Sequence, residues 1–134
     1  MLPALGSIAS QKANPTKQTM QRVKQLLDYA ATHPNAIITY RASDMVLARH
    51  SDASYLSKAN SQSISGGHFF MTDKFASTYI NGDVITISWI IKAVVSSAAE
   101  AELCVLFINF HEAITERIFL EEMGHKQPPT PMQT

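Results

Sequence analysis

The spacing of apolar residues changes near residue 96, and this change limits the folds open to the chain. Between residues 44 and 90, apolar residues come in short runs rich in β-branched side chains, which is typical of strands. From Ser96 onward the spacing is helical as far as Met123, with Leu103, Leu106, Phe107, Phe110, Ile114 and Ile118 forming one stripe. Several strands followed by one long or bent helix predict an α/β domain whose helix buries this stripe.

The strands can be placed by composition and alternation. Residues 36–40 read as a short strand and residues 44–55 as a longer one, in which Val46, Ala48, His50, Asp52 and Ser54 share a face. A polar loop at 57–65 leads through Gly66-Gly67 into a strand at 68–71. Tyr79-Ile80 and residues 84–89 flank Asn81-Gly82-Asp83, which predicts a tight hairpin.

Two helices can be bounded by their capping residues. Residues 1–13 show no clear period and are expected to form a loose lead-in. Asn14-Pro15 predicts a helix start, and His33-Pro34 ends that helix after Ala31. For the C-terminal helix, Ser96 or Ser97 can cap the start and Gly124 the end.

Composition narrows the class of protein. The chain has 134 residues, enough for one domain, and equal numbers of basic and acidic residues (11 each), so a globally basic nucleic-acid binder is not expected, although a local basic face remains open. A single cysteine excludes a disulfide framework and a multi-cysteine zinc module. The longest apolar stretch, 84–95, is interrupted by Lys92 and too short to span a bilayer, and no signal peptide is evident. An intracellular protein, cytoplasmic or nuclear and not secreted, with no membrane partner is expected.

Two carboxylates are the leading candidates for chemistry. Asp52 lies within an apolar strand, where a carboxylate is costly unless it is paired or binds a metal; the alternative is a strand-end aspartate facing water. Glu102 directly precedes the apolar stripe and is expected at the boundary between helix and sheet, whereas Glu100 is expected to be solvated. A strand carboxylate that meets a helix carboxylate is a plausible site for Mg²⁺.

Other polar and aromatic residues are assigned structural roles. Asp73 and Asp83 fall near turns, where aspartate usually bonds locally. His50 shares a strand face with Asp52, but the five histidines show no recognised metal-ligand spacing. Cys104 is expected to be a buried apolar residue. Phe69, Phe70, Phe107 and Phe110 are expected in the core.

Four segments, taken in order, carry a family resemblance: residues 51–55 (SDASY), 66–70 (GGHFF), 87–89 (ISW) and 96–103 (SSAAEAEL). The series resembles the ribonuclease H domain of copia-type retrotransposon polyproteins. Upstream, Asn14-Pro15-Thr16, residues 26–29 and residues 37–40 resemble the segment that connects reverse transcriptase to ribonuclease H. The resemblance implies a connecting segment with one helix at 1–43 and a partial ribonuclease H-like domain at 44–134.

The resemblance also implies a fold, an activity and a site. The fold is a mixed sheet whose first three strands are antiparallel, followed by a helix that carries an acid. The family hydrolyses the RNA strand of RNA–DNA hybrids with Mg²⁺ (or Mn²⁺), held by carboxylates that also position the attacking water. Asp52 and Glu102 match the first-strand aspartate and the helix glutamate, so they are the expected catalytic and metal-binding residues. Lys92 is the expected local contact to nucleic-acid phosphate.

The chain departs from the family pattern at several positions. Ser54 replaces a second acid, Leu103 replaces a tyrosine, and residues 90–95 replace a basic, glutamine-rich stretch. The family continues past a proline-rich turn, which residues 128–134 resemble, into a fourth strand that carries a third aspartate, then a fifth strand and a further helix. No Asp or Glu follows Glu122. We therefore expect a C-terminally truncated domain that lacks its last strands, and weak or absent ribonuclease activity.

A second class of function stays open. Without the fourth strand, the strand that holds Asp52 would become a poorly protected edge bearing Met45, Val46, Leu47 and Ala48. Such an edge favours a homodimer, in which case the chain would be a non-catalytic interaction module.

Overall fold

The computed structural model of the chain describes residues 1–74 and 80–134. These residues form two compact units, Met1–Ile37 and Ile38–Thr134. Residues 38–43, expected in the connecting segment, group with the second unit. Among the described residues, no helix combines the length and the apolar composition needed to cross a bilayer.

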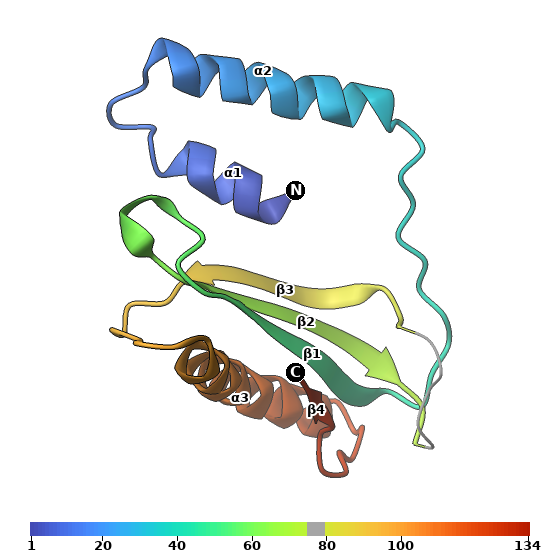
Figure 1. The fold of residues 1–134 in the computed structure, drawn as a ribbon. Coiled ribbons are helices and arrows are strands. Elements are labelled where there is room, and N and C mark those ends of the chain that lie inside the picture. Colours follow the sequence, from blue (N-terminus) through green and yellow to red (C-terminus); the bar gives the residue numbers. More distant parts are fainter. Residues whose placement is uncertain (75–79) are drawn as a thin grey trace. The chain divides into compact units, whose positions relative to one another are not determined.

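The first unit is a pair of helices, α1 (Leu2–Ala9) and α2 (Lys17–Thr32), shown in blue in Figure 1. The expected loose lead-in is wrong for α1, where Pro3 stands in the first turn, a position that tolerates proline. The helix predicted between Asn14 and Ala31 is confirmed as α2, but its cap is Thr16. The Thr16 hydroxyl accepts a hydrogen bond from the Thr19 backbone N–H at 3.1 Å, and the Thr19 hydroxyl accepts one from the Thr16 backbone N–H at 3.2 Å.

The second unit contains a mixed sheet in the order β3-β2-β1-β4. Its strands are β1 (Val46–Ser54), β2 (Ile64–Thr72), β3 (Asp83–Ile90) and the two-residue β4 (Met132–Gln133). β1, β2 and β3 pair antiparallel, whereas β4 runs parallel to β1 (Figure 1). A 3-10 turn, η1 (Ala59–Ser61), lies between β1 and β2. The α/β class and the antiparallel arrangement of the first three strands are confirmed. The expected absence of a fourth strand is wrong, because Met132 and Gln133 pair with Arg49 and His50 of β1.

Two local predictions, for residues 36–40 and 81–83, are wrong. Residues 36–40 form no strand; the Gly82 N–H instead donates to the Thr39 carbonyl at 3.0 Å. Residues 81–83 are not a tight hairpin turn, because the Asn81 amide is used to tie chain segments together, donating to the Met71 and Arg41 carbonyls at 3.0 Å each. Tyr79 lies outside the described residues.

The long helix α3 (Ala98–Glu122) covers one face of the sheet (Figure 1). Its ends are as predicted: the Ser97 hydroxyl accepts from the Glu100 N–H at 3.1 Å, and Gly124 adopts a φ of 92° just after the helix. The helix runs antiparallel to β1, because Val105 packs with Ala53 whereas Leu120 packs with Leu47 near the other end of the strand.

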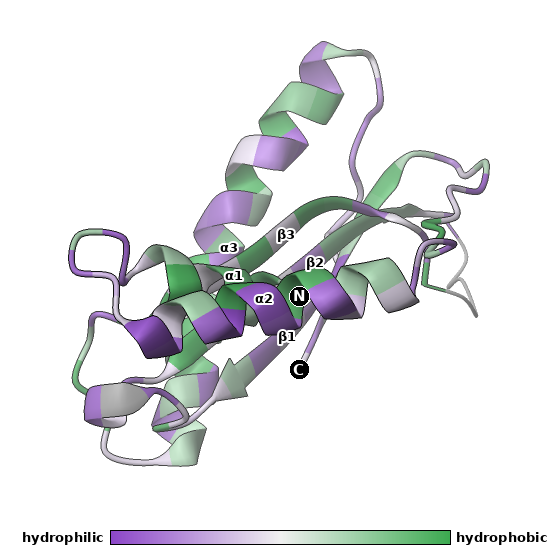
Figure 2. Cartoon of the chain, turned by 90° about the horizontal axis from the view of Figure 1, so that it is seen from above, coloured by the Kyte–Doolittle hydropathy of each residue, from purple (hydrophilic) through white to green (hydrophobic). Residues whose placement is uncertain are grey.

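The buried face of α3 is not the predicted one. Its sheet-facing residues are small or polar (Ala101, Val105, Asn109, Ala113), with Leu120 near the C-terminus. Apart from the half-buried Leu106, the predicted apolar stripe is instead exposed, including Leu103 at 68% and Phe107 at 63%. Apolar residues recur all along α3 (Figure 2), so their spacing alone could not select a face. Small side chains on the sheet side allow close packing, which decides the orientation.

Candidate functional site

Asp52 is exposed near the C-terminal end of β1, opposite Gly66 of β2. Its neighbours on either side face α3: the Ser51 hydroxyl is bonded to Asn109, and Ala53 packs against Ala101 and Val105. Because successive side chains of a strand point to opposite faces, Asp52 is directed away from the α3 side of the sheet. The carboxylate therefore lies in contact with water.

Glu102 lies in the first two turns of α3, one residue after the fully buried Ala101. The side chain is half-buried, and its Oε2 atom is buried with no hydrogen-bond partner among the described residues. An unpartnered carboxylate oxygen is energetically costly, and a bound cation or water is the usual remedy. The donor chemistry at Glu102 thus fits a divalent metal ion.

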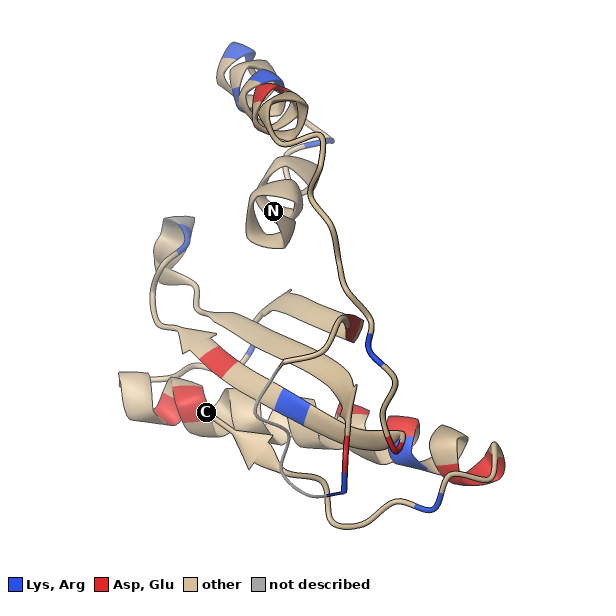
Figure 3. Ribbon diagram, turned by 90° about the vertical axis from the view of Figure 1, so that its right-hand side faces the viewer, with Lys and Arg blue, Asp and Glu red and all other residues tan. Residues whose placement is uncertain are grey.

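The two carboxylates are carried by adjacent elements at one end of the sheet. β1 and α3 meet there through the cluster that contains Ala53, Ala101 and Val105. The acidic positions of β1 and of the first turns of α3 lie at that same end in Figure 3. In the described ranges, no three His, Cys, Asp or Glu side chains gather closely enough to hold a metal. Asp52 nevertheless points to the face of the sheet away from α3, so the structure brings the elements that carry Asp52 and Glu102 together but does not turn the two carboxylates toward each other.

The remaining acids of interest maintain local structure. Asp73 accepts a hydrogen bond from the Asp44 N–H at 3.2 Å, and Asp44 in turn accepts from the Lys74 N–H at 3.0 Å. The Thr86 hydroxyl donates to Asp83 and lowers the pKa of that carboxyl. Glu100 accepts from the Ser96 N–H at 2.7 Å, which likewise lowers its pKa.

The histidines of the sheet have aromatic rather than metal-binding surroundings. His50 and His68 are cross-strand neighbours, and each packs against Phe70, with ring centroids 5.5 and 5.3 Å away. His68 Nε2 lies 3.3 Å from the Asn81 carbonyl. Phe69 and Phe70 are buried as predicted. The core placement of Phe107 and Phe110 is wrong, because both are exposed on α3.

Arg49 is a feature of the site region that the sequence did not single out. The residue is 1% exposed, between β1 and α3, and no acidic side chain in residues 1–74 and 80–134 forms an ion pair with it. Nη2 donates to the Leu106 carbonyl at 3.4 Å, and the guanidinium lies 5.5 Å from the centre of the Phe69 ring. Nε and Nη1 are buried and have no hydrogen-bond partner in the part of the chain that the structure describes. Burial lowers the pKa of Arg49 to about 10. From the sequence, one could predict only that Arg49 shares a face of β1 with Leu47 and Ser51.

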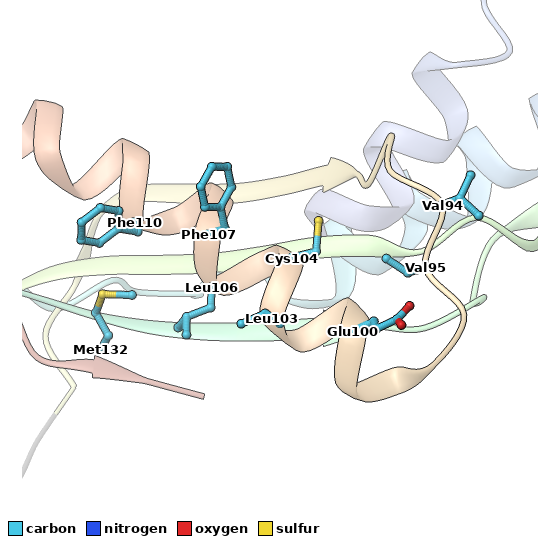
Figure 4. A pocket seen from close by; sticks show the side chains of 9 residues that line it. All are labelled: Val94, Val95, Glu100, Leu103, Cys104, Leu106, Phe107, Phe110 and Met132. Atoms are coloured by element: carbon cyan, nitrogen blue, oxygen red, sulfur yellow. The ribbon is translucent and has the colours of Figure 1, made fainter.

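A pocket of about 670 Å³ lies beside the N-terminal half of α3 (Figure 4). It is formed by α3 between Glu100 and Phe110, by Val94 and Val95 of the β3–α3 connection, and by Met132 of β4. Cys104 lines it and is half-buried, so the fully buried position expected for this thiol is wrong. Lys92 is exposed in the same connection.

Comparison of the chain with protein-family models, with curated proteins and with solved structures finds no match. Inference about function therefore rests on the strand order, on the positions of Asp52 and Glu102, and on the family resemblance of the sequence. Among these, the strand order is the feature that depends least on any single residue.

Proposed function

We propose that the second unit is a ribonuclease H-like domain derived from a copia-type retrotransposon. The observation that carries this proposal is the sheet order β3-β2-β1-β4, with an antiparallel β1-β2-β3 and a parallel β4. The sequence resemblance implies such a sheet, in which the strand that bears Asp52 lies between the second and the fourth strand. The helix that follows β3 carries Glu102, which also agrees with the implied order.

In this proposal Asp52 and Glu102 bind Mg²⁺ or Mn²⁺ and act on the RNA strand of an RNA–DNA hybrid. The cation would stabilise the charge that develops on the attacking and leaving oxygens of the phosphodiester. Glu102 supplies a buried oxygen that has no other partner, and Asp52 supplies a carboxylate in contact with water. Exposed Lys92 is the proposed phosphate contact, and its single charge favours weak, salt-sensitive binding.

We further propose that hydrolysis by this chain is weak or absent. Two-metal hydrolysis of phosphodiesters needs several carboxylates around the ions, and the site here has two candidates. Residues 123–134 contain no Asp or Glu. This shortage weakens metal binding and leaves the fold intact, because neither carboxylate belongs to the buried apolar clusters.

The test is cleavage of a labelled RNA–DNA hybrid in Mg²⁺ and, separately, in Mn²⁺, with RNA–RNA duplex as the specificity control. Asp52→Asn and Glu102→Gln remove one ligand charge each. The matched controls are Asp28→Asn on α2 and Glu122→Gln at the end of α3, both exposed. We expect slow, metal-dependent cleavage at most, lost in both site variants and kept in both controls.

Two results would contradict parts of this proposal. Robust turnover that Asp52→Asn abolishes would contradict the proposed weakness while supporting the assignment. Turnover that survives both Asp52→Asn and Glu102→Gln would contradict the assignment of the site itself.

A second candidate function is a non-catalytic, self-associating module. The expected edge dimer relied on Met45, Val46, Leu47 and Ala48, of which Met45 is half-buried and the other three are buried. Gln127 also forms hydrogen bonds with the backbone at this edge of β1. Self-association through α3 is favoured by its exposed apolar residues, which include Leu103, Phe107 and Phe110, because large apolar patches on a domain surface usually mark contact surfaces. Light scattering across a concentration series tests this: a dimer that Phe107→Ser dissociates supports it, and a monomer at all concentrations contradicts it.

A further inference from the structure

β3 lies at one edge of the sheet, and no other strand in residues 1–74 and 80–134 pairs with its outer side (Figure 1). Edge strands are usually protected from further pairing by charged residues, by proline or by a covering segment. Residues 84–90 contain no charged residue and no proline. Three of their apolar side chains are exposed, Val84 at 50%, Trp89 at 51% and Ile90 at 43%. This edge therefore lacks the residues that keep a further strand from pairing with it.

The backbone groups that point outward from this edge follow from one hydrogen bond. The Ile91 N–H donates to the Ser63 carbonyl at 2.9 Å, which continues the antiparallel register of β2 and β3 by one step. Because the N–H and C=O groups of successive strand residues point to opposite sides, those of Thr86, Ser88 and Ile90 point away from β2. A further strand at this edge would form its hydrogen bonds with these three residues.

We propose that two copies of this chain pair through β3, antiparallel and about a twofold axis beside Ile87. In this register Thr86 of each copy lies opposite Ser88 of the other, so the outward N–H and C=O groups of both residues form hydrogen bonds. The register also places Trp89 of each copy opposite Ile85 of the other. An aromatic side chain opposite a β-branched one is a favourable cross-strand pair, and here it covers an exposed indole ring.

A second copy is the partner that this edge fits, because the edge is complementary to itself. Asp83, the one charged residue of β3, lies at the end of the strand, so no like charges meet at the axis. The helix α3 packs against β1 and β2, at a distance from the axis. A twofold axis closes the contact at two copies and joins two four-stranded sheets into one. The inference does not depend on the ribonuclease proposal, and its surface differs from the exposed residues of α3.

Amide hydrogen exchange of the wild-type chain, measured over a concentration series, tests which residues pair. Exchange at the Thr86 and Ser88 amides should slow as the concentration rises. The slowing should be about tenfold when about nine-tenths of the chains are paired, because exchange then proceeds from the free chains. The Ile87 amide points toward β2 in the single chain and should change less. Light scattering over the same series should show a mass that approaches that of two chains.

Ser88→Pro should abolish the dimer, because proline removes an outward donor that the single chain does not use in its sheet. Trp89→Lys places a charge at the same edge without a backbone change, and it remains informative if the proline variant fails to fold. Phe107→Ser, on the exposed side of α3, is the matched control and should leave the dimer intact. A single chain at all concentrations, a dimer that both edge substitutions leave intact, or exchange at Thr86 and Ser88 that is independent of concentration would each overturn the proposal.

Discussion

Asn109 of α3 occupies the space that a side chain on Gly67 of β2 would need: a Cβ built on Gly67 would lie 2.5 Å from the Asn109 carboxamide oxygen. The same carboxamide donates to the Ser51 hydroxyl at 3.0 Å and to the Gly66 carbonyl at 2.9 Å. One buried side chain thus joins α3 to both β1 and β2. The closeness of helix and sheet at this point depends on glycine in one partner and asparagine in the other.

Gly67→Ala should therefore destabilise the second unit, because the added methyl group would force Asn109 or the helix to move. We expect a cost of about 1–3 kcal/mol, typical of overpacking. Chemical denaturation followed by circular dichroism measures it. Gly6→Ala in α1 is the matched control, since a Cβ there meets nothing within 4 Å, and it should be neutral or stabilising.

Asn109→Ala should also destabilise, by about 1–3 kcal/mol, because the Ser51 hydroxyl and the Gly66 carbonyl lose a buried donor. Combined with Gly67→Ala, however, the cost should be less than the sum, since the smaller side chain makes room for the new methyl group. Strict additivity in this double-mutant cycle would mean that Gly67 and Asn109 do not limit each other's packing.

At the start of β1, the side chain of Gln127 forms the hydrogen bonds that a neighbouring strand would otherwise form. Its side-chain amide accepts from the Leu47 N–H at 2.9 Å and donates to the Met45 carbonyl at 2.8 Å, as a paired backbone would. Gln127→Ala should speed amide hydrogen exchange at Leu47 and cost about 1–2 kcal/mol. Gln133→Ala, on exposed β4, is the control. Unchanged protection of Leu47 in Gln127→Ala would show that this amide does not close the edge.

Glu116 should make the unit less stable as pH rises. Burial and, secondarily, the nearby Glu112 raise its pKa above the ordinary value of 4.5. The folded state therefore holds its proton to higher pH than the unfolded state does, so stability declines through the interval between the two pKa values. Glu116→Gln should flatten this part of the pH profile, measured by denaturation between pH 4 and 7. A profile unchanged from wild type would contradict it.

The sequence predicted the positions of helices and strands better than it predicted which face of a helix is buried. β1, β2, β3, α2 and α3 were found because their periods and caps are local properties, such as the Ser97 cap and Gly124. The face of α3 could not be predicted, because apolar residues surround the helix and the choice depends on how closely Ala101 and Ala113 approach the sheet. The segment 36–40 has strand-forming residues but pairs through Thr39 with Gly82, a contact between residues far apart in the chain.

The candidate site was predictable only in part. Asp52 and Glu102 were identified from the sequence, and their elements meet at one end of the sheet, but Asp52 points to the face away from α3. The unpartnered oxygen of Glu102 and the buried donors of Arg49 required coordinates, because burial of single atoms depends on packing across the sheet. Arg49 had no sequence signal beyond its place on an alternating strand.

The most direct test of the central claim is where a divalent cation binds. In ¹⁵N-labelled protein titrated with Mn²⁺, paramagnetic broadening should appear first at the amides of Ala53 and Leu103, the neighbours of the two carboxylates. Asp52→Asn and Glu102→Gln should each weaken this broadening, and Glu122→Gln should not. Broadening centred elsewhere, or unaffected by either site substitution, would show that Asp52 and Glu102 do not hold a common metal ion.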